Sequence, residues 1–244
     1  MLQIEDESES QIIQESTLEI IPSRETAFTK IYLSESESSW ITIGWLSAEL
    51  EKYSKENYQS LFDIHPLNRG KVVMHNNEEC ISPRWHRSYL HQPKRELNQQ
   101  QSYMYSGFEE YEDLNLPIPF QKFLDFLNEK EENYPFNQVI VNWYANGKDH
   151  IAPHSDCEKG IIPDAGIKII TLCEDEKQPR ELRITPKKLK DDINDNLYAQ
   201  VKIQMKHGCI ITMGGEIQKK FKHRIPKAIE NPTSRISLTF RKFL

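Results

Sequence analysis

The sequence lacks any apolar run near the roughly 20 residues that a membrane-spanning helix needs, so we expect no transmembrane segment. Its first residues are acidic and rich in serine, and they lack the basic and then apolar segments of a secretion signal. No internal repeat is visible, and 244 residues suit one catalytic-sized domain. We therefore expect an intracellular protein, nuclear or cytoplasmic, with no membrane partner.

Cysteine is scarce and scattered. The four residues Cys80, Cys157, Cys173 and Cys209 include no CxxC pair. A zinc ribbon or a disulfide framework requires closely and regularly spaced cysteines, so this pattern excludes the first and disfavours the second. We expect reduced thiols.

The chain also lacks the positive charge that is typical of nucleic-acid-binding proteins, since its formal net charge is −6. Residues 1–60, however, carry 12 acidic and 4 basic side chains, whereas the remainder carries 25 and 27 and is slightly basic. Local basic patches, rather than net charge, contact phosphates, although solvated surface is an equally good interpretation of each. Two such clusters are Arg84, His86, Arg87, His91, Lys94, Arg95 and Lys219, Lys220, Lys222, Arg224, Lys227.

The pattern of apolar residues predicts helices followed by many strands. Residues 1–26, with the serine-rich segment 34–39, are typical of a flexible lead-in. Ser47 is a suitable N-cap for a helix over 47–60. Pro119 suits the first turn of a second helix, in which Phe120, Phe123, Leu124 and Leu127 recur at helical spacing. Residues 71–75 and 101–107 are expected to be extended. Further strands are expected at 139–144, 151–156, 167–172, 181–185, 198–205, 209–213 and 235–243. This order favours an α+β fold: a jelly-roll core (double-stranded β-helix) with N-terminal helices packed on one side.

The predicted terminal strand carries two arginines six residues apart. Because side chains alternate along a strand, Arg235, Ser237, Thr239 and Arg241 share one face, while the apolar residues between them share the other. Two buried guanidinium groups require an anionic ligand, which offsets the cost of removing their charges from water. The backbones of the two arginines lie roughly 20 Å apart, and each side chain reaches about 6 Å. The remaining gap suits a short dicarboxylate.

A metal site is suggested by His154 and Asp156, which point to one face of an extended segment while Ser155 points away. HxD alone is a common pattern, but His223 follows it downstream and could supply a third ligand. Two histidines and a carboxylate form the facial triad of non-haem Fe(II) oxygenases. A catalytic zinc site uses the same ligand types. The paired arginines favour iron, because an oxygenase that uses 2-oxoglutarate needs a cation for the far carboxylate.

Taken in order, these motifs resemble the AlkB family of Fe(II)/2-oxoglutarate dioxygenases, which remove alkyl groups from nucleic-acid bases. The resemblance covers residues 71 to 244. The matching segments are Pro83-Arg84, Tyr103-Met-Tyr105-Ser106-Gly107, Asn142-Trp-Tyr144-x-x-Gly147, Asp149-His150-Ile-x-x-His154-x-Asp156, His207-Gly208, Met213-Gly-Gly215, His223-x-Ile-Pro226 and Arg235-x-Ser-Leu-Thr-Phe-Arg241.

The resemblance implies a role for each group of residues. His154, Asp156 and His223 would hold Fe(II). The 2-oxoglutarate cosubstrate would be bound by Asn142, Tyr144, Arg235, Thr239 and Arg241. The substrate residues would be Tyr103, Tyr105, Ser106, Glu158 and Arg84. Helices and a nucleotide-recognition region would occupy about 40–135, and the jelly-roll core about 136–244, within one domain at 27–244.

Two details of the substrate side have two interpretations each. Tyr103 and Tyr105 share a strand face and suit stacking on a flipped base, but ordinary core packing also explains them. Val72 to His75 precedes the Pro-Arg motif and is either a base-flipping finger or an ordinary strand. Trp143 points away from the predicted ligand face and is expected in the core, while Cys157 beside the iron site is exposed to oxidation chemistry.

The resemblance therefore implies an oxidative demethylase that uses Fe(II), 2-oxoglutarate and O2. It would remove N-alkyl groups, such as those of N1-methyladenine and N3-methylcytosine, from DNA and also from RNA, releasing formaldehyde, succinate and CO2. Alkylated nucleic acid would be its partner, in DNA repair, and a monomer is expected. The alternatives are a dioxygenase acting on methyl groups of RNA or protein, and a non-enzymatic binder on an inactive oxygenase fold.

Overall fold

The computed structural model describes residues 16–26, 29–73, 79–90, 102–105, 108–111, 115–129, 131, 134–162, 165–187, 195–230 and 233–243. At 72–73, 102–105 and 108–111 only the backbone is described. Of the helices in these ranges, none is long and apolar enough to cross a bilayer. All four cysteines are free thiols, as predicted.

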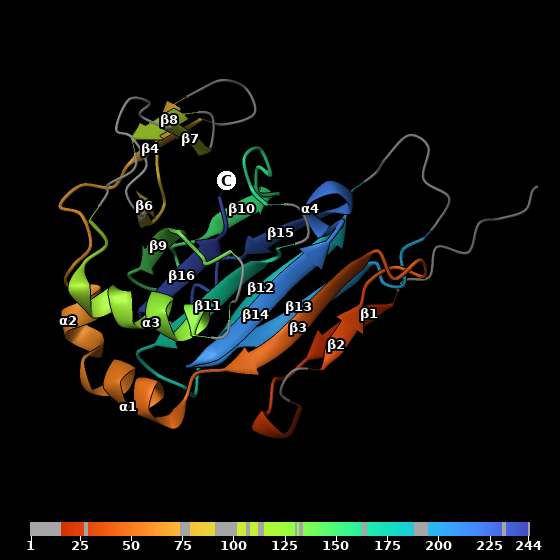
Figure 1. The fold of residues 1–244 in the computed structure, drawn as a ribbon, viewed down its shortest axis with the longest axis horizontal. Coiled ribbons are helices and arrows are strands. Elements are labelled where there is room, and N and C mark those ends of the chain that lie inside the picture. Colours follow the sequence, from red (N-terminus) through yellow and green to blue (C-terminus); the bar gives the residue numbers. More distant parts are fainter. Residues whose placement is uncertain are drawn as a thin grey trace, which may run out of the picture.

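Two β-sheets face each other as the layers of a jelly-roll core (Figure 1). The smaller sheet has the order β1 (Thr17–Ile20), β13 (Gln200–Met205), β12 (Arg180–Pro186), β15 (Phe221–Ile225) and β10 (Ile151–His154). The larger sheet has the order β2 (Lys30–Tyr32), β3 (Ser39–Trp45), β14 (Cys209–Gly215), β11 (Ile167–Cys173), β16 (Arg235–Arg241), β9 (Gln138–Tyr144) and β6 (Trp85–Leu90). Neighbouring strands are antiparallel except β1 and β13, which pair in parallel.

The larger sheet separates two apolar cores. One core lies between the sheets and contains Ile169, Ile184, Ile203 and Ile211. The other lies on the opposite face of the larger sheet, where strand residues pack with α1 (Ala48–Glu56), α2 (Tyr58–Phe62) and α3 (Ile118–Asn128). Figure 1 shows these three helices together on one side of the sheets. A site between the sheets is therefore walled by strands, while the helices support it from behind.

Alternation along β16 divides this strand between core and cavity, as the sequence predicts. Ile236, Leu238 and Phe240 pack in the helix-side core, while Arg235 and Arg241 line a cavity between the sheets. The adjacent β9 is divided in the same way. Trp143 is fully buried on the helix side, as expected, and donates its indole N–H to the carbonyl of Leu61 at 3.0 Å. Asn142 and Tyr144 line the cavity.

The helix predicted over 47–60 is two helices, and the break has a local cause. The hydroxyl of Ser47 accepts from the amide of Leu50, so the predicted N-cap is confirmed. At Asn57 the side-chain amide and the backbone N–H both donate to the carbonyl of Tyr53. The side-chain bond caps the last turn of α1 at Asn57, whose backbone leaves helical geometry (φ −110°, ψ 14°), and α2 begins at Tyr58. The second predicted helix is confirmed as α3, with Pro119 in its first turn and its four apolar residues buried.

The predicted tail at 1–26 is wrong for residues 17–20, which form β1 beside β13. The cause is tertiary, because Leu18 and Ile20 pack against the core between the sheets. The serine-rich segment is also ordered, since Ser34 and Ser39 are fully buried. The jelly roll includes β3 and β6 as well, so its strands begin well before the predicted boundary at 136.

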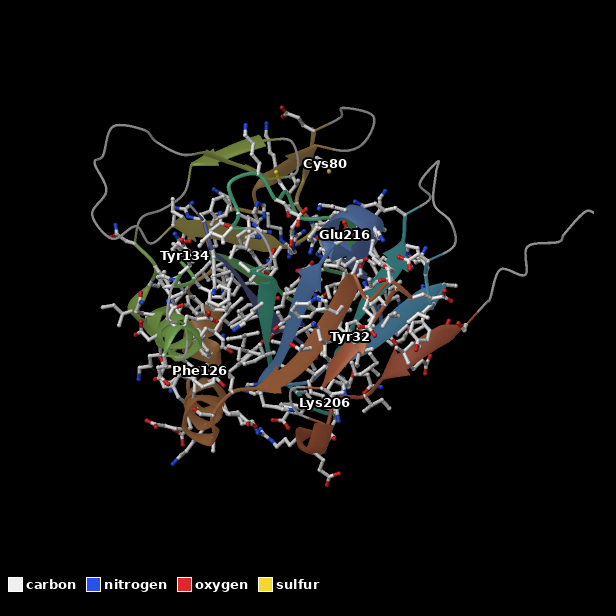
Figure 2. The ribbon with its side chains drawn as sticks, turned by 45° about the vertical axis from the view of Figure 1, so that its right-hand side comes forward. Tyr32, Cys80, Phe126, Tyr134, Lys206 and Glu216 are labelled. Carbon is white, nitrogen blue, oxygen red and sulfur yellow. The ribbon has the colours of Figure 1, made fainter. Side chains whose placement is uncertain are left out.

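Two short hairpins lie at the end of the molecule away from the helices. They are β4 (Lys71–Val73) with β5 (Glu79–Ile81), and β7 (Ser102–Tyr105) with β8 (Phe108–Tyr111). Figure 2 shows Cys80 of β5 at this end and Phe126 of α3 in the helix layer. The first half of the predicted finger, Val72 and Val73, lies in β4, and Met74 and His75 lie outside the described residues.

Replacing Phe120 by alanine should lower the free energy of unfolding by about 3–5 kcal/mol, because this fully buried ring packs edge-on against Trp143. Ile118→Ala on the same helix is the matched control, since Ile118 is 83% exposed and should cost less than about 0.5 kcal/mol. Urea unfolding of both variants measures the difference. Equal losses would contradict the assignment of this helix face to the core.

Candidate metal centre

His154, Asp156 and His223 lie together at the edge of the smaller sheet. His154 and His223 are direct partners in the β10–β15 ladder, and their ring centroids are 4.2 Å apart. Nε2 of His154 lies 3.9 Å from Oδ1 of Asp156, and Nε2 of His223 lies 3.9 Å from Oδ2. One ligand atom from each residue falls within 4.8 Å of the others. A single metal ion can therefore bind all three.

The protonation states of the three groups suit a metal ion. Burial and the neighbouring His154 lower the pKa of His223 to about 3, and burial also lowers the pKa of His154. Burial alone would raise the pKa of Asp156, but Arg241 and the two histidines outweigh it and hold that pKa below its usual value. At neutral pH the cluster presents two neutral imidazoles and a carboxylate, which are the forms that bind metals.

The cluster opens into a cavity between the sheets. The lining is contributed by β9, β10, β11, β12, β13, β15 and β16. It includes every predicted metal and cosubstrate residue: His154, Asp156, His223, Asn142, Tyr144, Arg235, Thr239 and Arg241. The strand register and the alternation of side chains thus bring these residues together, although they span 100 positions of the sequence.

Arg235 occupies one end of the cavity and has unsatisfied donors. It is 1% exposed, and its Nη2 donates to Oγ1 of Thr171 at 3.1 Å. Its Nε and Nη1 are buried without a hydrogen-bond partner among the described residues. The guanidinium groups of Arg235 and Arg180 both lie over the ring of Tyr144. The pKa of Arg180 is lowered, first by burial and second by the charge of Arg235. Buried donors with a second cation nearby fit the far carboxylate of 2-oxoglutarate.

Arg241 was predicted to bind the cosubstrate. In the structure it also contacts Asp156 of the His-Asp-His cluster. Its Nη2 donates to Oδ1 of Asp156 at 2.6 Å, and its Nη1 donates to Oε1 of Gln138 at 3.2 Å. The guanidinium thus orients the metal-binding carboxylate and leaves Oδ2 on the side of His223. The roles of Gln138 and Thr171 were not predicted from the sequence, because neither belongs to a recognisable motif.

Arg84, which was predicted to contact the substrate, is buried in the cavity wall beside Asn142. It is 3% exposed, and its Nε donates to Oδ1 of Asn142 at 2.7 Å. Its Nη1 donates to the carbonyl of His150 at 3.4 Å. The guanidinium therefore fixes the orientation of the Asn142 amide in the cavity wall.

Of the remaining predicted substrate residues, Glu158 has a described side chain, and it does not line the metal cavity. Glu158 is exposed and lines a neighbouring cavity of about 770 Å³, formed with Met213 to Lys219. Tyr103 and Tyr105 lie in β7, where only the backbone is described, and Ser106 lies outside the described residues. Cys157 is exposed, beside the cluster in sequence.

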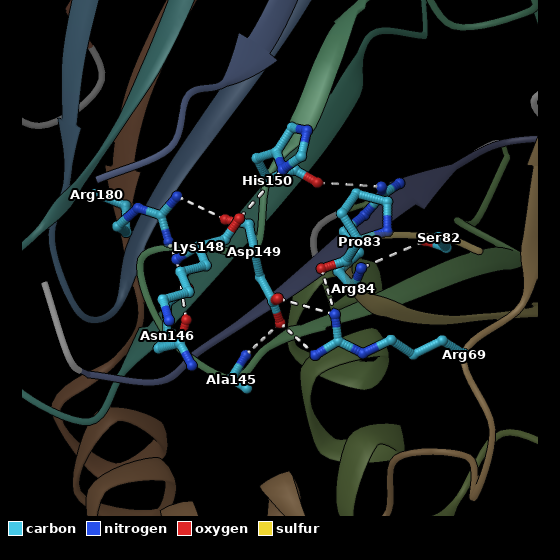
Figure 3. Close-up of polar contacts among 10 residues, drawn as sticks. All are labelled: Arg69, Ser82, Pro83, Arg84, Ala145, Asn146, Lys148, Asp149, His150 and Arg180. Carbon is cyan, nitrogen blue, oxygen red and sulfur yellow. Dashed lines mark hydrogen bonds and ion pairs between the residues drawn. The ribbon is translucent and has the colours of Figure 1, made fainter. Parts of the chain in front are cut away.

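A buried polar network centred on Asp149 fixes the strand ends around the cavity (Figure 3). Asp149 accepts two hydrogen bonds from Arg69, at 2.8 and 2.9 Å, and one from the amide of Ala145 at 2.8 Å. Arg180 donates to the carbonyls of Asp149 and Pro226. The network connects the end of β9 to the starts of β10 and β12. Asp149 lies in a matched motif, but no sequence signal identified Arg69 or Arg180 as its partners.

Acid should destabilise the metal-free protein through His223. Its pKa is about 3 when folded and about 6.5 when unfolded, so between these values the unfolded chain binds more protons and the free energy of unfolding falls as pH falls. His223→Asn should make this decline shallower by up to about 1.4 kcal/mol per pH unit. Urea unfolding at pH 7, 6 and 5 measures the slopes, and parallel slopes for the two proteins would refute the assignment.

Comparison with known proteins agrees with this geometry. Residues 30–241 match the model of the 2OG-Fe(II) oxygenase superfamily. The chain is 35% identical over 122 residues to the Bos taurus alpha-ketoglutarate-dependent dioxygenase alkB homolog 3, covering 47% of this chain and 40% of that protein. The Homo sapiens homolog 3 is 33% identical over 117 residues, with the same coverage. The Arabidopsis thaliana DNA oxidative demethylase ALKBH2 is 28% identical over 140 residues, covering 52% and 44%.

These matches extend over less than half the length of each curated relative. The family model, in contrast, matches most of this chain and includes every residue of the His-Asp-His cluster. The chain belongs to the 2OG-Fe(II) oxygenase superfamily, an oxidoreductase family with Fe(II) as its metal and 2-oxoglutarate and O2 as its cosubstrates.

Proposed function

We propose that this chain is an oxidative demethylase that removes N-methyl groups from the bases of DNA, and also of RNA, with N1-methyladenine and N3-methylcytosine as its substrates. The observation that carries the proposal is the joint occurrence, in one cavity, of the His154–Asp156–His223 cluster and the unsatisfied donors of Arg235. The relatives, a DNA oxidative demethylase among them, support the nucleic-acid substrate.

Different residues of the cavity would have different roles in this reaction. His154, Asp156 and His223 would hold Fe(II), with Arg241 keeping the carboxylate ionised and oriented. Arg235 would bind the far carboxylate of 2-oxoglutarate, and Asn142, held by Arg84, would contact its other end. When bound, Fe(II), 2-oxoglutarate and O2 supply the oxidation of the methyl carbon, and 2-oxoglutarate is consumed to succinate and CO2. The hydroxylated methyl group then leaves as formaldehyde, and the base is restored.

The outer face of the smaller sheet supports a polyanionic partner. Arg183 of β12 lies directly opposite Arg224 of β15 on one side and Lys202 of β13 on the other. Lys222 shares this face with Arg224, whereas His223 between them points into the cavity. Like charges opposite each other destabilise a sheet. Arg183 and Lys202 each meet one carboxylate, but the row stays basic, and phosphates would offset its repulsion.

Formaldehyde and succinate released from methylated oligonucleotides test this function. With Fe(II), 2-oxoglutarate and ascorbate, we expect one formaldehyde per repaired base, and His154→Ala should abolish release because one of the three metal ligands is lost. Single-stranded DNA, duplex DNA, tRNA and a methylated peptide, each at the same concentration, separate the substrate classes. Activity on the peptide alone would replace the proposal by a protein demethylase. Full biological effect of His154→Ala would indicate a non-enzymatic binder.

Arg235→Gln should raise the KM for 2-oxoglutarate by about 100-fold or more, because a buried, charge-assisted pair with the far carboxylate is lost, which costs roughly 3 kcal/mol. Succinate formation at varied 2-oxoglutarate concentration measures this change. Arg183→Gln, on the outer face of the sheet, is the control and should leave that KM unchanged. An unchanged KM in Arg235→Gln would remove Arg235 from the cosubstrate site.

A further inference from the structure

Asp156 is the metal ligand that sheet hydrogen bonding leaves unfixed. His154 and His223 are paired in the β10–β15 ladder, but β10 ends at His154, two residues before Asp156. A carboxylate on a segment outside the ladder needs other contacts to hold its backbone. The ion pair with Arg241 fixes the carboxylate oxygen at the tip of the side chain and not the peptide that carries it.

Gln218 supplies the missing backbone contact. Its side-chain Oε1 accepts a hydrogen bond from the N–H of Asp156 at 2.9 Å, and Gln218 is 5% exposed. A second bond acts one residue earlier, where the hydroxyl of Ser155 donates to the carbonyl of Phe221 at 2.8 Å. Both partners lie within the five residues that precede His223. The segment that delivers the third metal ligand therefore also holds the second.

The support under Gln218 is itself rigid. It lies in α4 (Ile217–Lys220), where Lys187 Nζ donates to the carbonyl of Gln218 at 2.7 Å. The turn before α4 is fixed at Gly215, which has φ +64° and whose added Cβ would lie 2.0 Å from the carbonyl oxygen of Ser38. In Figure 1, α4 lies beside β10 and β15. Gln218 is therefore presented from a tethered turn and not from a free loop.

We propose that Gln218 is a positioning residue for the metal-binding carboxylate of Asp156. The inference rests on the proposed binding of Fe(II) by His154, Asp156 and His223. Without the Gln218 acceptor, the partly buried N–H of Asp156 loses its partner, and its peptide rotates to find another. The carboxylate then leaves the position that both histidines share.

Two substitutions separate the hydrogen bond from packing. Gln218→Met keeps nearly the same volume and removes the acceptor, whereas Gln218→Glu keeps an acceptor oxygen at the same position. Anaerobic titration of the full chain with Mn(II) and with Co(II) gives the metal affinity, and the visible bands of Co(II) report the ligand geometry. We expect about 10-fold to 100-fold weaker binding and altered Co(II) bands in Gln218→Met, as for other residues that orient metal ligands. Gln218→Glu should bind within a few-fold of the wild type.

Controls distinguish the possible failures. Gln200→Met on β13 should leave metal affinity unchanged, and urea unfolding of each metal-free variant shows whether the fold is retained. Wild-type affinity and bands in Gln218→Met would overturn the role of Gln218, and so would equally weak binding by Gln218→Met and Gln218→Glu. His154→Ala provides the reference for a damaged cluster. If wild type and His154→Ala bind metal equally weakly, the metal assignment fails, and the role of Gln218 fails with it.

Discussion

The ion pair between Arg241 and Asp156 is the contact on which the rest of the site depends. It joins β16 of the larger sheet to the segment after β10 of the smaller sheet, across the interior of the sandwich. Both side chains are almost fully buried, at 2% and 6% exposure, so each would be costly without the other. The pair also sets the electrostatics of the cavity, because it keeps Asp156 ionised beside two neutral imidazoles.

The formal charge of the cavity explains why Fe(II) and 2-oxoglutarate would bind in it together. Two arginines and one carboxylate leave one excess positive charge when the histidines are neutral. A divalent cation alone would add to this charge, and a dicarboxylate alone would reverse it. Fe(II) and 2-oxoglutarate together add no net charge, so both can enter without changing the electrostatic balance under which the cavity is folded. Charge balance therefore connects Arg235 to the metal cluster, although the two lie at different positions along the cavity.

The sequence allowed the side-chain directions of the site to be predicted, but not its contacts. Strand alternation was sufficient to place Arg235 and Arg241 on one face and Trp143 on the other, because a period of two requires no tertiary information. It gives no partner for a side chain that contacts another strand. The bond from Arg84 to Asn142 therefore appeared only in the structure, and Arg84 had been assigned to the substrate.

The errors in the fold have the same origin. Residues 17–20 were placed in a tail because the local composition is acidic, yet they pair with β13, whose register partners lie 183 positions away. Local composition cannot report so distant a pairing. The break at Asn57 is the opposite case, since there the side chain bonds back to the carbonyl of Tyr53 and the backbone leaves helical geometry within one residue. The end of α1 at Asn57 thus depends on local contacts, whereas the formation of β1 depends on its pairing with β13.

The site also has an order of dependence along the chain. Residues 215–225 contain a glycine that fixes a turn, the amide that contacts Asp156, the carbonyl that contacts Ser155 and the ligand His223. When β15 pairs with β10, one segment brings His223 opposite His154 and fixes the backbone of Asp156 in the same step. Two metal ligands therefore acquire their positions from the segment that carries the third. This is why an HxD pattern, uninformative alone, gains its meaning from a histidine 67 residues beyond it.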